Sequence, residues 1–253
     1  MAMKSILDHK IISSRYFFPR PEPIAEPFWV DCGEHSLACW YQKSFADAFT
    51  LIHFHGNGEV VADYCDDFAL EVQKLGLNCF LAEYRGYGLS EGQPALSGML
   101  DDVPHIIEAT GQRLDKLIVF GRSVGSLYAL QAINVFPDIA GCIIESGIAD
   151  LLERIMLRVN PEEIQVSYTE LSQAVARDFN HHQKFEMYKK PVLIMHSQYD
   201  GLVDVTHGQR LFEWANEPKE IHIFERGDHN SVMYYNYEQY FSLIKQFMKN
   251  LER

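Results

Sequence analysis

Short apolar runs alternate along the chain with longer segments of helical character. Seven runs have the length of buried strands: Leu37–Tyr41, Phe49–Phe54, Asn78–Glu83, Leu117–Phe120, Gly141–Glu145, Val192–Met195 and Ile221–Phe224. Five segments between or after them are helix candidates: Glu59–Leu75, Ser97–Gln112, Val124–Phe136, Thr206–Ala215 and Tyr237–Leu251. Buried strands that alternate with helices are typical of a mostly parallel sheet covered on both faces. The pattern therefore predicts an α/β fold.

One long interval interrupts this alternation between the strands at 141–145 and 192–195. Residues 148–190 contain apolar positions at helical spacing: Leu151, Leu152, Ile155, Met156 and Val159. They follow the carboxyl end of a strand, where open sheets of this kind bind ligands. We expect a short helical cap insertion within a single domain that spans residues 1–253. Packing of its apolar face on the sheet edge is favoured over contact with a substrate.

The segment before the first strand is rich in proline. Residues 19–27 hold four prolines, which exclude a helix interior or a central strand. We expect an extended lead-in on the surface, anchored by Tyr16, Phe17 and Phe18.

Charge and cysteine content narrow the function classes. The 253 residues carry a formal net charge of −13, which repels nucleic-acid phosphates and anionic membrane faces. The five cysteines are scattered without a CxxC pair, which disfavours a disulfide framework and a structural zinc site. We find neither a secretory signal nor an apolar span or stable membrane anchor. These features predict a soluble, cytoplasmic protein that does not bind nucleic acid.

Two segments match the GxSxG pattern of a serine nucleophile, residues 121–125 and 88–92. Ser123 follows an apolar strand and precedes a helix, and glycines stand two residues before and after it, where strand and helix nearly touch. Ser90 follows a glycine-rich loop and precedes Gln93-Pro94, so a turn is favoured there. We therefore expect Ser123 to be the nucleophile; a tight turn in a sheet without catalysis is the alternative.

A serine hydroxyl needs a base and an acid that orients the base. His229 lies between the last strand and the last helix, and four residues separate Asp200 from the buried strand that ends near Met195. The order Ser123, Asp200, His229 is the one this architecture requires. Other acids remain open, namely Glu145, Asp150 and Asp204.

The remaining histidines fit less well. His222 lies within a strand, and His181 and His182 are expected on the surface. His53 and His55 form an HxH pair without further ligands, so a metallohydrolase is disfavoured.

Acyl transfer also needs donors for an oxyanion, and amides at helix starts can supply them. We expect the backbone amides of Asn57 and Val124, because the loop 55–58 opens a helix at Glu59 and Val124 follows the serine. A competing interpretation treats residues 56–58 as the start of a dinucleotide fingerprint with Glu83 as ribose acceptor. Val61 then occupies the position of the third glycine and argues against it.

Taken together, these segments resemble the α/β-hydrolase superfamily over most of the chain. The similarity rests on residues 16–20, 55–58, 84–88 with Ser90 and Gly92, 121–126, and the loops of Asp200 and His229. Within the superfamily the chain is similar to small single-domain serine hydrolases that include protein depalmitoylases and their bacterial relatives. Relatives more often carry Asp at the position of Glu83. We expect the side chain at this position to support a loop.

The resemblance implies an α/β-hydrolase fold with a Ser123, Asp200 and His229 triad. The expected reaction is cleavage of a carboxylic ester or thioester through an acyl-enzyme, on a small-molecule or acylated substrate, without metal or organic cofactor. The superfamily also holds peptidases and members without catalysis, so a catalytically silent binding module remains an alternative, as does a dinucleotide-binding protein.

Overall fold

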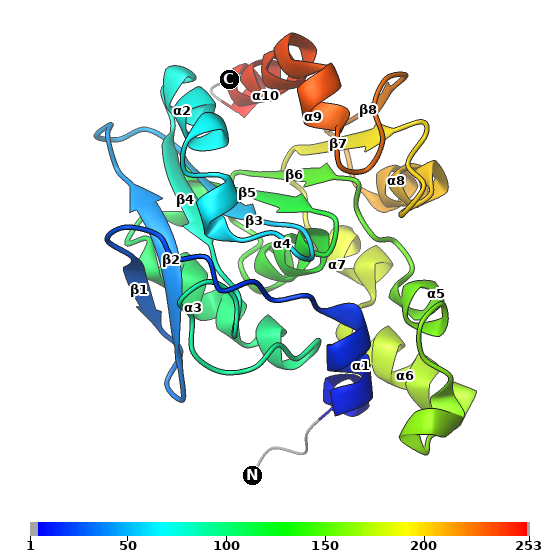
Figure 1. The fold of residues 1–253 in the computed structure, drawn as a ribbon. Helices are drawn as coiled ribbons and strands as arrows, with labels where there is room; N and C mark the ends of the chain where they lie inside the picture. Colours follow the sequence, from blue (N-terminus) through cyan, green and yellow to red (C-terminus); the bar gives the residue numbers. More distant parts are fainter. Residues whose placement is uncertain (1–4, 252–253) are drawn as a thin grey trace.

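The computed structural model describes residues 5–251, which form an eight-stranded sheet with helices on both faces (Figure 1). The strand order is β1-β2-β4-β3-β5-β6-β7-β8. The strands are β1 Phe28–Asp31, β2 Ser36–Gln42, β3 Thr50–Phe54, β4 Asn78–Ala82, β5 Leu117–Arg122, β6 Gly141–Glu145, β7 Val192–Ser197 and β8 Lys219–Phe224. β2 pairs antiparallel with β1 and β4, and every other pairing is parallel. The predicted mostly parallel α/β fold is confirmed.

Helices cover both faces of this sheet (Figure 1). One face carries α2 Asp67–Lys74, α9 Val232–Tyr235 and α10 Tyr237–Leu251. The other carries α3 Asp102–Ala109, α4 Gly125–Val135 and α8 Val205–Trp214. Side chains alternate across a strand, so Leu117 and Val119 of β5 enter one core and Ile118 and Phe120 enter the other. Burial on both faces explains why the central strands read as continuous apolar runs.

Two local predictions at the start of the chain were incomplete. The sequence missed β1, which forms a hairpin with β2 through a turn at Gly33, where φ is +82°. The proposed helix 59–75 is also shorter, because a 3-10 turn, Val61–Asp63, precedes α2. The proline-rich segment is extended as expected and follows the short helix α1 Lys10–Tyr16.

The interval 148–190 contains four helical elements: α5 Leu151–Met156, η5 Pro161–Ile164, α6 Tyr168–Asp178 and α7 His181–Met187. Leu151, Ile155 and Val159 share a buried face. α7 packs on α4 and α8, and α6 packs on the amino-terminal 3-10 turn η1 Ile6–Asp8. The insertion thus rests on helices, whereas the sequence favoured the sheet edge. His181, expected on the surface, is buried in α7 and only 2% exposed.

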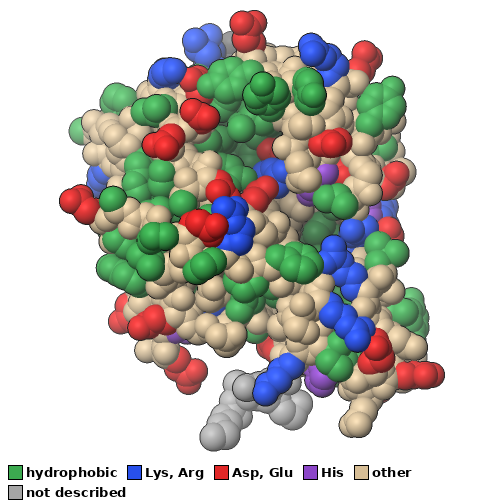
Figure 2. All heavy atoms as spheres, viewed as in Figure 1, with side chains coloured by type: hydrophobic (Ala, Val, Ile, Leu, Met, Phe, Trp, Pro, Cys, Tyr) green, Lys and Arg blue, Asp and Glu red, His purple; other side chains and the backbone are tan. Residues whose placement is uncertain are grey.

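Acidic, basic and hydrophobic side chains are interspersed on the face shown in Figure 2. Within residues 5–251, the helices are too short or too polar to cross a lipid bilayer.

Candidate active site

Ser123 occupies the sharp turn between β5 and α4. Its φ is +52°, in the left-handed region, and its amide donates to the carbonyl of Glu145 at 2.9 Å. A Cβ at Gly121 would lie 2.7 Å from the Cβ of Ala129, and one at Gly125 would overlap the carbonyl oxygen of Phe54. The two glycines therefore let strand and helix approach closely enough to present the strained serine.

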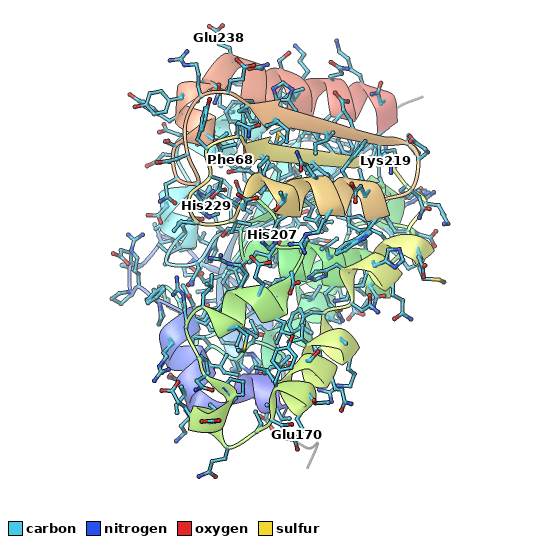
Figure 3. The ribbon with its side chains drawn as sticks, turned by 90° about the vertical axis from the view of Figure 1, so that its right-hand side faces the viewer. Phe68, Glu170, His207, Lys219, His229 and Glu238 are labelled. Carbon is cyan, nitrogen blue, oxygen red and sulfur yellow. The ribbon has the colours of Figure 1, made fainter. Side chains whose placement is uncertain are left out.

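The three residues expected to act together are adjacent in space. His229, labelled in Figure 3, lies in the loop between β8 and α9. Its Nε2 is 2.9 Å from Ser123 Oγ, and its Nδ1 is 2.7 Å from Asp200 Oδ2. None of the three residues is more than 8% exposed. With a proton on Nδ1 donated to Asp200, Nε2 can accept the proton of the serine hydroxyl.

Asp200 is fixed by the loop that carries it. Its Oδ1 accepts hydrogen bonds from the amides of Leu202 at 2.9 Å and Val203 at 2.8 Å. Its Oδ2 faces His229 Nδ1 at 2.7 Å and, at 3.4 Å, His196 Nε2. Burial alone raises the pKa of Asp200, but hydrogen bonds from His196 and His229, together with electrostatic attraction to His229, outweigh burial and hold that pKa well below its usual range. The carboxylate is therefore ionised and able to orient the imidazole.

The structure places the two expected oxyanion donors in different settings. Val124 is the N-cap residue of α4, as predicted, whereas Asn57 lies in a loop because the next α-helix starts at Asp67. The prediction that a helix opens at Glu59 was wrong. Neither Asn57 nor Val124 lies inside a helix or strand. Among the described residues, 5–251, neither backbone amide donates to a backbone carbonyl.

The Asn57 side chain ties its loop to the amino-terminal segment. Oδ1 accepts from the amide of Phe18 at 3.1 Å and from the Tyr87 hydroxyl at 3.0 Å, and Nδ2 donates to the carbonyl of Tyr16. Tyr16 and Phe17 are buried as expected, but Phe18 is 49% exposed. The lead-in is therefore part of the wall that supports the Asn57 loop.

Glu83 and His55 form a buried hydrogen-bonded pair beneath the same loop. Glu83 Oε1 is 2.7 Å from His55 Nε2, and Oε2 accepts from the amide of Val61 at 3.0 Å. Burial lowers the pKa of His55, but the Glu83 carboxylate and its hydrogen bond outweigh burial and raise that pKa. Glu83 is thus committed to loop support and is not free to hold a ribose, as the dinucleotide interpretation requires.

The alternative nucleophile and acids have structural contacts of their own. Ser90 lies in a turn, where its Oγ accepts from the amide of Ala38 at 2.8 Å. Asp150 and Asp204 cap the first turns of α5 and α8. Glu145 accepts from the Tyr240 hydroxyl at 2.5 Å, not from His229.

His53 and His55, the HxH pair of β3 and the loop after it, are occupied by other contacts. His53 is packed among the rings of Tyr64, Phe68 and Phe120, and burial lowers its pKa well below its usual value. His55 Nε2 is paired with Glu83, so these two histidines do not form a free pair.

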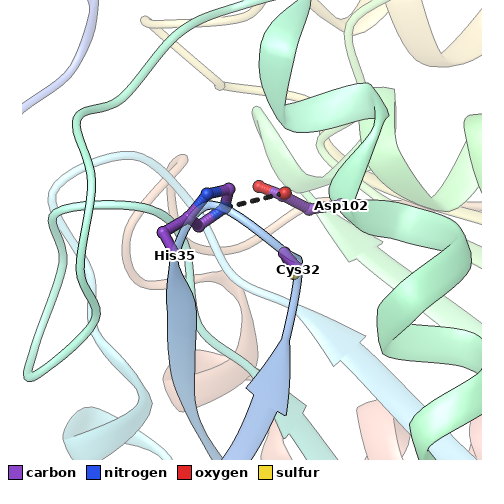
Figure 4. A group of neighbouring side chains, drawn as sticks. All are labelled: Cys32, His35 and Asp102. Carbon is purple, nitrogen blue, oxygen red and sulfur yellow. Dashed lines mark hydrogen bonds and ion pairs between the residues drawn. The ribbon is translucent and has the colours of Figure 1, made fainter.

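Cys32, His35 and Asp102 also lie close together (Figure 4). Asp102 is held by the Arg85 guanidinium at 2.6 Å and 2.7 Å, and burial raises the pKa of Cys32 to about 12. A thiol that keeps its proton beside a paired carboxylate is a poor metal ligand. This cluster instead joins the β1–β2 hairpin to α3.

The sequence did not single out two charged residues beside the site, Arg122 and Glu59. Arg122 ends the otherwise apolar strand β5 and is only 8% exposed. The sequence did contain a sign of its role: Arg122 is a charged residue at the end of a buried strand, and a buried charge requires polar partners.

Comparison with known proteins agrees with the fold. A family model described as serine aminopeptidase, S33 matches residues 47–179, more than half of the chain. Human alpha/beta hydrolase domain-containing protein 17B is 26% identical over 218 residues, which cover 84% of this chain and 70% of that protein. Mouse alpha/beta hydrolase domain-containing protein 17C is 23% identical over 223 residues, which cover 86% of this chain and 65% of that protein.

Solved structures show the same architecture. The esterase Pf2001 of Pyrococcus furiosus aligns with a TM-score of 0.71 and 19% identity, over 92% of this chain and 98% of that chain. Est1E of Butyrivibrio proteoclasticus, solved with ferulic acid, aligns with a TM-score of 0.72 and 18% identity, over 88% and 98%. These alignments and the family match confirm the α/β-hydrolase resemblance seen in the sequence. The chain belongs to the serine aminopeptidase S33 family of the α/β-hydrolase superfamily.

Proposed function

We propose that this protein is a serine hydrolase that cleaves a carboxylic ester or thioester through an acyl-enzyme. The observation that carries the proposal is the continuous relay from Ser123 Oγ through His229 to the ionised Asp200, with successive distances of 2.9 Å and 2.7 Å. A structural serine has no need of a buried imidazole and carboxylate in line with its hydroxyl.

The reaction follows from these positions. Ser123 Oγ attacks the carbonyl carbon while His229 Nε2 takes the hydroxyl proton, and the amides of Asn57 and Val124 stabilise the oxyanion. His229 then returns the proton to the leaving alcohol or thiol as the bond to it breaks. A water molecule attacks the acyl-enzyme with His229 again as base, which releases the acid and regenerates the serine.

The groups that carry the reaction belong to this chain, so the proposed chemistry uses no metal or organic cofactor. The proposed substrate is a small molecule or an acylated molecule in the cytoplasm, and residues 1–253 act as one domain. The family also suggests an amide substrate, since its model is described as an aminopeptidase.

The first test is covalent labelling with a fluorophosphonate, whose phosphonyl oxygen occupies the place of the oxyanion. We expect one adduct by intact mass, mapped to Ser123. A titration with NAD(H) tests the dinucleotide alternative, and no adduct together with micromolar nucleotide affinity would favour that alternative.

A substrate panel then resolves the bond type. p-Nitrophenyl esters of increasing acyl length, a matched acyl thioester series and aminoacyl p-nitroanilides are compared by kcat/KM. We expect the esters and thioesters to be cleaved faster than the anilides. A preference for the anilides would contradict the proposed ester or thioester specificity.

A further inference from the structure

The guanidinium of Arg122 lies where three parts of the candidate active site meet. Arg122 is the residue directly before Ser123, at the end of β5, and the turn at Ser123 sends the two side chains in different directions. Ser123 contacts His229 through its Oγ, whereas Arg122 contacts groups behind the site.

The first contact fixes the histidine loop. Arg122 Nη2 donates to the backbone carbonyl of His229 at 2.7 Å. This bond joins the backbone of the candidate base to the strand that carries the nucleophile. It therefore constrains the position of the loop independently of the Asp200 contact to the imidazole.

The second contact reaches the oxyanion loop through Glu59. Arg122 Nη1 pairs with Glu59 Oε1, while Glu59 Oε2 accepts from the amide of Gly56 at 2.5 Å and from the Tyr64 hydroxyl at 2.6 Å. A Cβ at Gly56 would lie 2.5 Å from Arg122 Nη1, so the loop backbone passes directly over the guanidinium. The residue next to Gly56 is Asn57, the proposed oxyanion donor.

The third contact anchors the guanidinium itself. Arg122 Nε lies 3.2 Å from Glu145 Oε1, and the other oxygen of Glu145 accepts from the Tyr240 hydroxyl of α10 at 2.5 Å. Glu145 is 2% exposed and Arg122 is 8% exposed, so both members of this pair are buried. The nearby carboxylates outweigh the effect of burial and raise the pKa of Arg122, which therefore stays charged.

These contacts do not reflect close packing alone. Arg122, Glu59, Glu145 and Tyr240 line a cavity of about 260 Å³ between α2 and α9, and Figure 2 shows a hollow with hydrophobic walls there. The guanidinium thus forms part of a cavity wall and is held by its polar partners. A planar group with several fixed donors suits this task, and an ammonium on a flexible stem does not.

We infer that Arg122 is a positioning residue that sets the distance between the His229 loop and the Asn57 oxyanion loop. The inference rests on the proposed function, because it concerns the geometry of that same reaction. Arg122 touches no reacting atom and acts through the His229 carbonyl and through Glu59. Loss of the Arg122 contacts therefore lowers kcat more than it changes KM, because they set the positions of the reacting groups.

The test compares Arg122→Lys with Glu59→Gln. Arg122→Lys keeps a positive charge between the carboxylates but cannot bond to Glu59, Glu145 and the His229 carbonyl together. Glu59→Gln weakens only the branch to the oxyanion loop. We expect kcat to fall about 10- to 100-fold for Arg122→Lys and by less for Glu59→Gln, with KM within about twofold. Arg113→Lys is the matched control, because Arg113 pairs with exposed Asp115 at the other end of β5.

Fluorophosphonate labelling separates positioning from folding. In a positioning variant every molecule is labelled on Ser123, but the rate constant falls with kcat. In a misfolded variant the labelled fraction falls and the remaining molecules react at the wild-type rate. Wild-type rate constants for both Arg122→Lys and Glu59→Gln would overturn the inference, as would a reduced labelled fraction alone. Failure of the wild-type protein to label would instead refute the proposed function.

Discussion

Asp200→Asn is the most informative single change, because the structure defines both functions of the carboxylate. Oδ1 accepts two amide hydrogens, from Leu202 and Val203, and Oδ2 accepts from His229 Nδ1. An asparagine has one oxygen and one NH₂ group. If its oxygen keeps the two amide bonds, its NH₂ group faces His229.

That orientation reverses the relay. Nδ1 of His229 must then accept, so the proton moves to Nε2, which donates to Ser123 Oγ and can no longer take its proton. The opposite orientation places the NH₂ group against two backbone N–H donors and leaves their hydrogen bonds unmade. We expect kcat/KM to fall by about four decades, or about 5.4 kcal/mol at about 1.36 kcal/mol per tenfold.

The assay is kcat/KM on the best p-nitrophenyl ester of the panel, with urea unfolding in parallel. We expect the free energy of unfolding to fall by no more than about 3 kcal/mol, so the variant stays folded. Asp204→Asn is the matched control, since Asp204 caps α8 four residues further along. A loss below tenfold in Asp200→Asn would refute the reasoning, and so would a larger loss in Glu145→Gln.

Three further changes test other parts of the structure. Ser123→Ala should lower turnover by about three to six decades with unchanged folding, whereas Ser90→Ala should retain activity; the reverse result would reassign the nucleophile. EDTA should leave kcat unchanged, and a chelator-sensitive rate would implicate His53 and His55 as ligands. Burial lowers the pKa of Lys184 from 10.5 to about 8, so the unfolded chain binds more protons between those values and wild-type stability rises with pH there. Lys184→Met has no group that titrates here, so its free energy of unfolding lacks this rise. We expect the free energy of unfolding of the variant, taken relative to the wild type, to fall by about 3 kcal/mol between pH 7 and pH 11 in urea unfolding; a constant difference would contradict the lowered pKa of Lys184.

Local sequence patterns were enough to predict the main elements and their order. Buried parallel strands must be apolar on both faces, so runs such as 117–120 and 192–195 could be recognised without any knowledge of their partners. The last helix was predicted as 237–251 and runs from Tyr237 to Leu251, because its apolar positions repeat over four turns. β1 was missed, because its residues Phe28–Asp31 are few and follow directly on the proline-rich segment.

The sequence also indicated which residues belong to the candidate site. The sharp turn at Ser123 depends on local sterics, so the glycines at positions 121 and 125 are enough to indicate the close approach of strand and helix. Asp200 and His229 could be placed at the same sheet edge, because both follow parallel strands at their carboxyl ends.

Contacts between segments far apart in the chain could be identified only in the folded protein. No sequence pattern links Arg122 to Glu59 or to His229, which lie 63 and 107 residues away from it. The contact with His229 is made to a backbone carbonyl, which every residue has, so the residue type at position 229 does not reveal it. Burial of His181 followed from where α7 docks on α4 and α8, which no local pattern encodes. Local periodicity reports how one segment meets an apolar surface, whereas polar partners and the packing of an insertion depend on the arrangement of the whole fold.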